Sequence, residues 1–262
     1  MLVTKCKICD SNTVSIFAAN ILNKYPVQYL QCENCNFVQP EDIFWLNEAY
    51  EDAITKQDIG LLYRNRFILP LLKSLIKLFF NKKKNIIDYG AGYGVLVRTM
   101  RDYGYNMYRH DKYCINLFTE GFDHIDDDNR FELLTAFEVF EHLVDPVNEV
   151  EKMLKLSDNI FFSTEVQPSK NITPNNWWYV MPETGQHVAL YSITSLKNLA
   201  ERHNLNFYTN GKNLHLFTKK KINNLIFRLV TIHKLSIIID LLLKDNPSLL
   251  SADYNSIKSK NL

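Results

Sequence analysis

The chain has 262 residues, of which 46% are apolar, enough to bury the core of one large domain with a small appendage. Its 30 Lys and Arg side chains nearly cancel its 29 Asp and Glu side chains, so the composition excludes the strongly basic surface typical of nucleic-acid-binding proteins. The N-terminus MLVTKCKICD lacks the apolar segment of a secretory signal, and we expect a cytoplasmic protein.

Four of the five cysteines are paired by their spacing. Cys6 and Cys9 form one C-x-x-C unit, Cys32 and Cys35 form a second, and 22 residues separate the two units. A single unit is typical of a redox dithiol, but two at this separation favour a closed thiolate site for structural Zn²⁺. We therefore expect a zinc-binding knuckle over residues 1–45. The segment between the pairs carries one lysine and no arginine, which argues against a nucleic-acid-binding zinc ribbon.

Residues 46–83 are expected to form a helical segment on the substrate side of the fold. Leu69, Leu72, Leu75, Ile76 and Phe79 recur at helical spacing, which predicts a helix with one apolar face. Polar side chains earlier in the segment are hard to explain as core and are candidates for a substrate pocket: Tyr50, Asp58, Arg64 and Asn65.

From Lys84 the chain alternates short apolar runs with helix-like segments. The runs NIIDYG, YNMYRHD, FELLTAFEVF and NIFFSTEV are predicted strands, and LNFYTNG with NLHLFTKKK predicts a closing hairpin. The intervening segments VLVRTMRDYG, DPVNEVEKMLK and SITSLKNLAERH are predicted helices. This alternation predicts an α/β fold with a doubly wound, mostly parallel sheet over residues 84–221.

A glycine-rich turn, Gly90–Gly94, follows Asp88 at the end of the first predicted strand. The dinucleotide fingerprint needs a third glycine where Val95 stands, so a pyrophosphate-binding loop is disfavoured. Asp111 follows the second predicted strand, where a carboxylate can accept both ribose hydroxyls of an adenosine. The pattern therefore favours an adenosine-containing ligand other than a dinucleotide.

The succession DYGAGYG, HD and FELLTAFEVFEHLVDP resembles the class I S-adenosylmethionine-dependent methyltransferases, which have a seven-stranded Rossmann-like sheet. The resemblance implies that the methyl donor is surrounded by Asp88, Gly90, Gly92 and Gly94 at its methionyl part, Asp111 at the ribose, and Thr135, Ala136, Phe137 and Glu138 along the adenosine and sulfonium. It also assigns Glu141 and His142 to the family's Glu-His pair. The family's usual Asp at the start of the fourth strand is Glu132 here.

The cysteine-rich N-terminus, together with FWLNEAYEDAI and DIGLLYRN, resembles the zinc-bearing methyltransferases of bacterial capsule, polysaccharide and deoxysugar pathways. That resemblance implies a knuckle that abuts the substrate cleft. Sugar C-methyltransferases with a similar zinc module carry a Glu-His pair before Tyr-Phe-Ser, where this chain has Gln186-His187 and then Leu190-Tyr191-Ser192. The difference favours oxygen over carbon as the methyl acceptor.

We therefore predict an S-adenosylmethionine-dependent O-methyltransferase that acts on a sugar hydroxyl, in a nucleotide-linked sugar or a surface-polysaccharide precursor. C-methylation of a keto-deoxysugar nucleotide and methylation of a small molecule outside sugar metabolism are alternative enzyme functions. A zinc-ribbon nucleic-acid-binding protein is the alternative of a different class, although neither the net charge nor the knuckle supports a nucleic-acid partner.

Proton removal from a sugar hydroxyl requires a base, and a neutral histidine within ~3 Å of the hydroxyl can supply it. His187, on the long segment after NIFFSTEV, is the predicted general base, and His142 and Glu141 are further catalytic candidates. Helix capping is the alternative role for both histidines. His215 alternates with leucines inside a predicted strand and is expected to be a core residue.

Three consecutive aromatic residues precede His187 on the same segment. Trp177, Trp178 and Tyr179 either anchor the segment to the body of the protein or form a platform for a sugar ring. The sequence does not assign these two roles among the three rings.

Residues 222–262 are expected to form an amphipathic helical extension. Its most apolar stretch is interrupted by Arg228, His233, Lys234 and Asp240, so it falls short of the ~18 uncharged residues that a transmembrane helix needs. We expect the extension to pack on the body of the protein or on a second copy in a homodimer. Peripheral membrane contact is the alternative.

Overall fold

The computed structural model describes residues 4–51, 59–125, 129–168 and 171–260. The chain divides into two compact units that are interleaved in sequence. The first unit consists of Met1–Thr55, Glu138–Met153 and Phe162–Lys219. The second consists of Lys56–Phe137, Leu154–Phe161 and Lys220–Leu262. The predicted domain boundaries after residues 45, 83 and 221 stay predictions.

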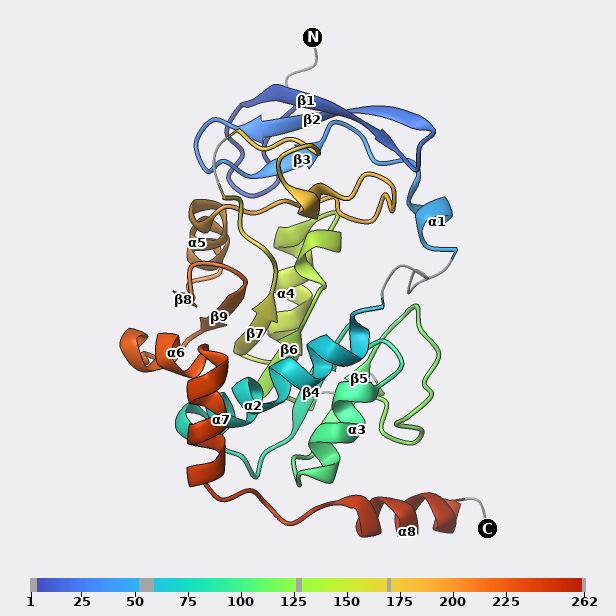
Figure 1. Ribbon diagram of the computed structural model, residues 1–262, viewed down its shortest axis with the longest axis vertical. Helices are drawn as coiled ribbons and strands as arrows, with labels where there is room; N and C mark the ends of the chain where they lie inside the picture. The colour runs from blue at the N-terminus through green and yellow to red at the C-terminus, as the bar shows by residue number, and fades with distance from the viewer. Residues whose placement is uncertain (1–3, 52–58, 126–128, 169–170, 261–262) are drawn as a thin grey trace. The chain divides into compact units, whose positions relative to one another are not determined.

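Strands and helices alternate over most of the chain (Figure 1). The strands are β1 (Thr13–Ile21), β2 (Tyr25–Cys32), β3 (Val38–Pro40), β4 (Ile86–Tyr89), β5 (Met107–His110), β6 (Leu133–Ala136), β7 (Asn159–Ser163), β8 (Asn206–Thr209) and β9 (Leu214–Thr218). The helices are α1 (Leu46–Ala49), α2 (Leu61–Phe79), α3 (Val95–Asp102), α4 (Pro146–Leu156), α5 (Ile193–Arg202), α6 (Asn224–Val230), α7 (His233–Leu242) and α8 (Leu250–Lys260). Two short 3₁₀ helices are η1 (Phe140–His142) and η2 (Trp178–Val180).

The larger sheet has the strand order β5-β4-β6-β7-β9-β8. β4 pairs in parallel with both β5 and β6, and β8 pairs antiparallel with β9. The strands β4, β6, β7 and β9 are buried almost throughout, as expected for a sheet covered by helices. The predicted α/β fold with a mostly parallel sheet and an edge hairpin is confirmed.

The sheet has six strands in the part of the chain that the structure describes, whereas the resemblance implies seven. Beside β5, the described chain makes only an isolated parallel bridge between Arg109 and Asp123. Residues 126–128, shortly after Asp123, lie outside the described residues.

A second, three-stranded antiparallel sheet, β1-β2-β3, occupies the N-terminal region and was not predicted. β1 and β2 join through Leu22, Asn23 and Lys24, and the first two lie in the left-handed region with φ of 54° and 57°. Hairpin turns with positive φ at two successive positions normally use Asn-Gly or a similar pair. Leucine at the first position hides this hairpin from sequence analysis.

The predicted helices are confirmed, and their ends have identifiable causes. α3 is followed by Gly104 with φ of 83°, a conformation that glycine adopts without strain. α5 begins with a capping box, in which the Ser192 hydroxyl accepts from the Ser195 backbone N–H and the Ser195 hydroxyl accepts from the Ser192 N–H.

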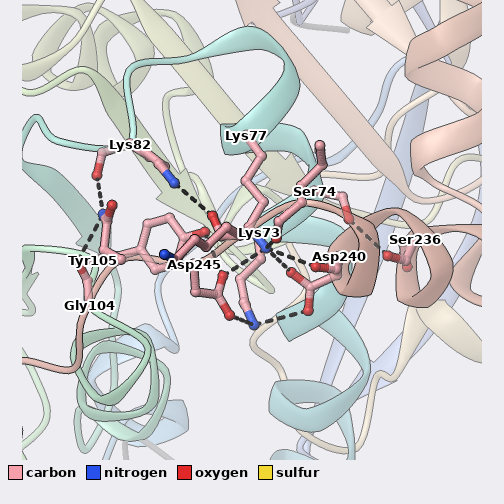
Figure 2. A network of polar contacts seen from close by, with 12 residues as sticks. Lys73, Ser74, Lys77, Lys82, Gly104, Tyr105, Ser236, Asp240 and Asp245 are labelled. Carbon is pink, nitrogen blue, oxygen red and sulfur yellow. Dashed lines mark hydrogen bonds and ion pairs between the residues drawn. The ribbon is translucent and has the colours of Figure 1, made fainter.

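A buried ion-pair network joins α2 to α7 and to the segment after it (Figure 2). Lys73 Nζ lies 2.9 Å from Asp240 Oδ2 and 2.8 Å from Asp245 Oδ2. Lys77 Nζ lies 2.6 Å from Asp240 Oδ1 and 2.7 Å from Asp245 Oδ1. Each lysine thus bridges both carboxylates, and Ser74 adds a hydrogen bond to the Ser236 carbonyl in α7.

α8 is held to α3 by charge, since most of its surface is polar. Asp253 is buried and accepts two hydrogen bonds from Arg101, of 2.8 and 2.7 Å, and one of 2.9 Å from Arg98. No helix among the described residues is long and apolar enough to cross a bilayer. α6 and α7 nevertheless expose several large apolar side chains: Leu225, Ile226, Leu229, Ile237, Ile238, Leu241 and Leu242.

We expect Lys73→Met to destabilise the protein by about 3 kcal/mol, because removing one partner of a buried ion pair leaves charge uncompensated. Burial raises the pKa of Asp245, but the hydrogen bonds from Lys73 and Lys77 outweigh it and hold the pKa below its ordinary value. The contribution of Asp245 to the free energy of unfolding is therefore complete above its unfolded-state pKa of about 3.9. It is lost as the pH falls through its lower folded-state pKa.

Urea unfolding at neutral pH checks this prediction, with the exposed Lys83→Met as the matched control. Equal unfolding midpoints for the two variants would show that the network contributes no net stability.

Candidate active site

The glycine turn after β4 has a backbone that only glycine adopts without strain. Gly90, Gly92 and Gly94 have φ of 71°, 55° and 88°. The Gly90 N–H donates to the His110 carbonyl at 2.8 Å, and the Gly92 N–H donates to Asp111 Oδ2 at 2.8 Å. The turn is thereby tied to the end of β5, as expected for a ligand cradle at the carboxyl ends of parallel strands.

The Asp111 carboxylate is already engaged by the protein backbone. Besides the Gly92 N–H, it accepts hydrogen bonds from the N–H groups of Tyr113 at 2.8 Å and Cys114 at 2.7 Å. A carboxylate offers about four acceptor positions, so one position is left for a ribose hydroxyl where two were expected.

Asp88 and Thr135 form a buried polar pair below the turn. Thr135 donates its hydroxyl proton to Asp88 Oδ1, and both side chains are buried. Burial, reinforced by the charge of Asp111, raises the pKa of Asp88 to about 7. Ala136 is also fully buried. These three predicted cofactor residues therefore shape the turn from beneath it, whereas Phe137 is partly exposed.

β6 ends at Ala136, whereas the predicted strand continued to Phe140. Glu138 has φ of 56°, which is strained for a residue other than glycine, and this breaks the strand. Its N–H donates to Ser163 Oγ at 2.8 Å, and Ser163 Oγ donates to Glu138 Oε1 at 2.6 Å. The chain then turns into the helix η1, which carries Glu141 and His142.

Glu141, His142 and His187 form a compact cluster in the first unit. One ligand-type atom from each side chain lies within 4.8 Å of the others. His142 Nδ1 is 3.1 Å from the Gln186 carbonyl, and His187 Nδ1 is 2.7 Å from the Tyr179 carbonyl. A carbonyl only accepts, so each Nδ1 must carry a proton. The free lone pair of each ring is then on Nε2.

Backbone contacts bring these distant segments together. The N–H groups of Val188 and Ala189 both donate to the Glu141 carbonyl at 2.9 Å. The Tyr191 hydroxyl donates to the Phe140 carbonyl at 2.9 Å. Residues 187–191 are thus pinned to η1, which sets His187 beside Glu141.

The Gly185–Gln186 stretch is anchored from its other side. Trp45 Nε1 donates to the Gly185 carbonyl at 2.8 Å, and Gln186 Nε2 donates to the Ala49 carbonyl at 2.8 Å. The Gln186 side chain is therefore a structural tie, and Glu141 supplies the carboxylate next to His187. The pairing of residues 141 and 187 is a tertiary contact with no signal in the local sequence.

Burial keeps both imidazoles of the cluster neutral at pH 7. It lowers the pKa of His142 to about 4 and that of His187 to about 3. Burial, followed by the negative charge of Glu141, raises the pKa of Tyr179 and Tyr191 well above the ordinary value for a phenol. The cluster therefore combines neutral imidazoles and phenols with one acidic side chain.

The other predicted site residues lie in varied environments. Trp177 and Tyr179 are buried in the core of the first unit and anchor the segment, whereas Trp178 is 68% exposed. The Tyr50 ring lies 6.2 Å from the His142 ring. Arg64 and Asn65 belong to α2 in the second unit, where Asn65 donates to the Leu61 carbonyl, and Asp58 lies outside the described residues.

His215 is a core residue, as predicted. It is fully buried, and its Nδ1 and Nε2 hydrogen bond to Thr209 Oγ1 at 2.9 Å and to the Thr164 carbonyl at 3.0 Å.

The four paired cysteines converge at one point. Their sulfur atoms all lie within 4.8 Å of one another, with Cys6 3.6 Å from Cys35 and Cys9 3.4 Å from Cys32. Four sulfurs around one Zn²⁺ at about 2.3 Å lie about 3.8 Å apart, so the cluster fits a tetrahedral ion.

The two cysteine turns have the same backbone pattern. Asp10 N–H donates to the Cys6 carbonyl and Asn36 N–H to the Cys32 carbonyl, each at 3.0 Å. Asp10 and Asn36 have φ of 59° and 57°. Both residue types tolerate the left-handed region, which closes each turn around its two sulfurs.

Comparison with known proteins identifies the fold of the central region. A family model described as "Methyltransferase domain" matches residues 62–210, more than half of the chain. No curated protein matches the chain.

Similar solved structures include three methyltransferases, each with bound S-adenosylhomocysteine. The calicheamicin biosynthesis enzyme CalO1 is 11% identical with a TM-score of 0.42, and the match covers 68% of this chain and 64% of that one. The plantazolicin methyltransferase BpumL is 13% identical with a TM-score of 0.47, and the match covers 74% and 88%. Magnesium protoporphyrin IX methyltransferase from Synechocystis PCC 6803 is 11% identical with a TM-score of 0.44, and the match covers 66% and 93%. The chain thus spans less than two thirds of the length of CalO1.

We expect Gly94→Ala to destabilise the second unit by about 1–3 kcal/mol through a strained left-handed backbone and a clash. An added Cβ would lie 2.4 Å from Thr119 Oγ1. Chemical denaturation of the variant and of Gly94→Ala/Thr119→Ala checks both causes, because the double variant relieves the hydroxyl clash but not the backbone strain. A single variant as stable as wild type would contradict the described turn.

Proposed function

The chain belongs to the methyltransferase-domain family, and we propose that it is a class I S-adenosylmethionine-dependent methyltransferase whose acceptor is a sugar hydroxyl. The sugar would be nucleotide-linked or part of a surface-polysaccharide precursor. The observation that carries the proposal is the cluster of Glu141, His142 and His187, with two neutral imidazoles beside a carboxylate. A hydroxyl acceptor needs such a base to remove its proton during methyl transfer, whereas a neutral amine can attack the methyl group without one. The choice of a sugar rests on the resemblance of the N-terminal region.

The methyl donor supplies an electrophilic methyl group on a sulfonium, and the protein must bind and align it. We assign its binding to the turn at Gly90, Gly92 and Gly94, whose backbone can approach a ligand closely because no Cβ intervenes. Asp111 retains an acceptor position for the ribose, and Phe137 and Glu138 follow the end of β6. Asp88, Thr135 and Ala136 hold this frame from below.

In the proposed reaction, the acceptor oxygen forms a bond to the methyl carbon as the carbon–sulfur bond breaks, and its electron pair stays on sulfur. The hydroxyl proton passes to His187 Nε2, since Nδ1 is already protonated. The imidazolium that forms lies beside Glu141, whose charge compensates for the low basicity that burial imposes. Abstraction of a carbon-bound proton needs a stronger base, which disfavours C-methylation.

We propose that the four-cysteine cluster holds a structural zinc ion in a reducing, cytoplasmic environment. All four ligand positions are taken by sulfur, so the ion would have no position for a substrate. The cluster is tied to the segment that carries His187. Ser192 Oγ donates to the Cys35 carbonyl at 2.6 Å, and the N–H and carbonyl groups of Val38 and Leu190 exchange two hydrogen bonds.

His187→Ala is expected to lower turnover on a sugar nucleotide by about 10²–10⁴-fold, because it removes the proton acceptor. Binding of S-adenosylmethionine is expected to be unchanged. A turnover assay across a panel of nucleotide sugars, with calorimetry for the donor, checks this. His203→Gln, at the end of α5 and away from the cluster, is the matched control. Unchanged turnover would remove His187 as the base.

Purified protein is expected to contain one zinc ion per chain by elemental analysis. Cys35→Ser should lower the zinc content and the melting temperature, because the ion stabilises the knuckle. Cys114→Ser is the matched control, since Cys114 belongs to the second unit and is not one of the four clustered cysteines. Zinc content that is insensitive to Cys35→Ser would refute the assignment.

A further inference from the structure

We infer that Glu141, His142 and His187 bind one divalent metal ion, through the carboxylate and the two Nε2 atoms. This site is distinct from the cysteine cluster in both ligand type and ligand number. The inference deepens the proposed function, on which its catalytic meaning rests, because the ion would take over from His187 the task of promoting proton loss from the acceptor.

The ligand atoms are already gathered by the fold. One ligand-type atom from each side chain lies within 4.8 Å of the others, whereas ligands of one ion at about 2.1 Å lie about 3.0–3.4 Å apart. Binding would draw these atoms together by side-chain rotation. The backbone does not need to move, because the carbonyl of Glu141 is already fixed by Val188 and Ala189.

Both imidazoles are oriented as metal ligands are. In metal sites the second ring nitrogen almost always donates to a carbonyl or carboxylate, which fixes the tautomer and turns the other nitrogen to the ion. His142 Nδ1 has this relation to the Gln186 carbonyl, and His187 Nδ1 has it to the Tyr179 carbonyl. Helix capping and general-base catalysis do not require the same arrangement at both rings.

The charge around the cluster favours a cation. Glu141 is completely buried, and its negative charge contributes to the raised pKa of both Tyr179 and Tyr191. A divalent ion compensates a buried carboxylate better than neutral imidazoles do.

The ligand set indicates what the ion does. Two histidines and one glutamate are the donors of catalytic sites, in which three protein ligands leave positions for water or substrate. Imidazole with carboxylate suits Mn²⁺, Fe²⁺, Co²⁺ or Zn²⁺. An acceptor hydroxyl in an open position would be polarised and would lose its proton more easily to solvent water, since both Nε2 atoms would be bound to the ion. A neighbouring pair of hydroxyls, as sugars carry, could occupy two positions.

Mn²⁺ binding to protein that carries one zinc ion per chain, in the cysteine cluster, tests the site without reference to turnover, because Mn²⁺ prefers nitrogen and oxygen ligands to thiolates. Loss of the free Mn²⁺ signal in electron paramagnetic resonance is expected to give one ion per chain. Glu141→Gln keeps the side-chain shape, and we expect it and His187→Ala to weaken binding by at least about 10-fold. His203→Gln is expected to bind Mn²⁺ as wild type does.

Absence of Mn²⁺ binding by the wild type, or equal binding by the cluster variants, would overturn the inference. If Glu141→Gln does not fold, the wild type titrated with Co²⁺ decides the question. Visible bands of cobalt bound to nitrogen and oxygen, without thiolate charge-transfer absorption, support the site, and their absence contradicts it.

The same measurements separate this inference from the proposed function. Mn²⁺ binding without methylation of any sugar would leave the metal site standing and remove the sugar acceptor. Sugar methylation by a protein that binds no Mn²⁺ or Co²⁺ at the cluster would leave His187 as the base.

Discussion

The buried carboxylate of Glu141 is the constraint around which the first unit is arranged. An ionised carboxylate loses several kcal/mol of hydration in an interior, so its surroundings must supply charge or hydrogen bonds. The segment 185–191 is fixed at both ends: by Trp45 and Ala49 at Gly185 and Gln186, and by Phe140 at Tyr191. These contacts hold His187 beside Glu141.

The cysteine cluster has a place in the same scaffold. β3 begins three residues after Cys35, and its first residue, Val38, bridges Leu190. Gln167 adds hydrogen bonds of 2.8 Å to the carbonyls of both Asn36 and Leu190. A small three-stranded sheet has little core of its own, so an ion at its end would stiffen the strand that positions His187.

Much of the fold follows from local signals in the sequence. The alternation of apolar runs with capped helices predicts the parallel sheet, and Gly90, Gly92 and Gly94 predict a turn that the structure confirms. The β1–β2 hairpin is not predicted from the sequence, because its turn has Leu22 at a position where Asn, Asp or Gly is usual. The early end of β6 is also not predicted from the sequence. Glu138 has a positive φ, and its N–H bonds to Ser163, a contact between segments that are distant in the sequence.

The candidate site, too, is only partly predictable from local sequence. Histidine and glutamate are visible as residue types, but the pairing of Glu141 with His187 depends on two backbone hydrogen bonds that no spacing rule predicts. The predicted role of Gln186 as a substitute for glutamate rests on its neighbour in sequence, and its side chain bonds to Ala49 instead.

The pKa values of the two imidazoles sharpen the choice between base and ligand. With pKa values of about 3 and 4, each ring is neutral at pH 7 but accepts a proton weakly. Neutral Nε2 is the form that binds a metal ion. The burial that weakens His187 as a base therefore leaves its ability to coordinate intact. An enzyme that keeps such a cluster dry gains more from a bound cation, whose attraction for a hydroxyl oxygen strengthens as water is excluded.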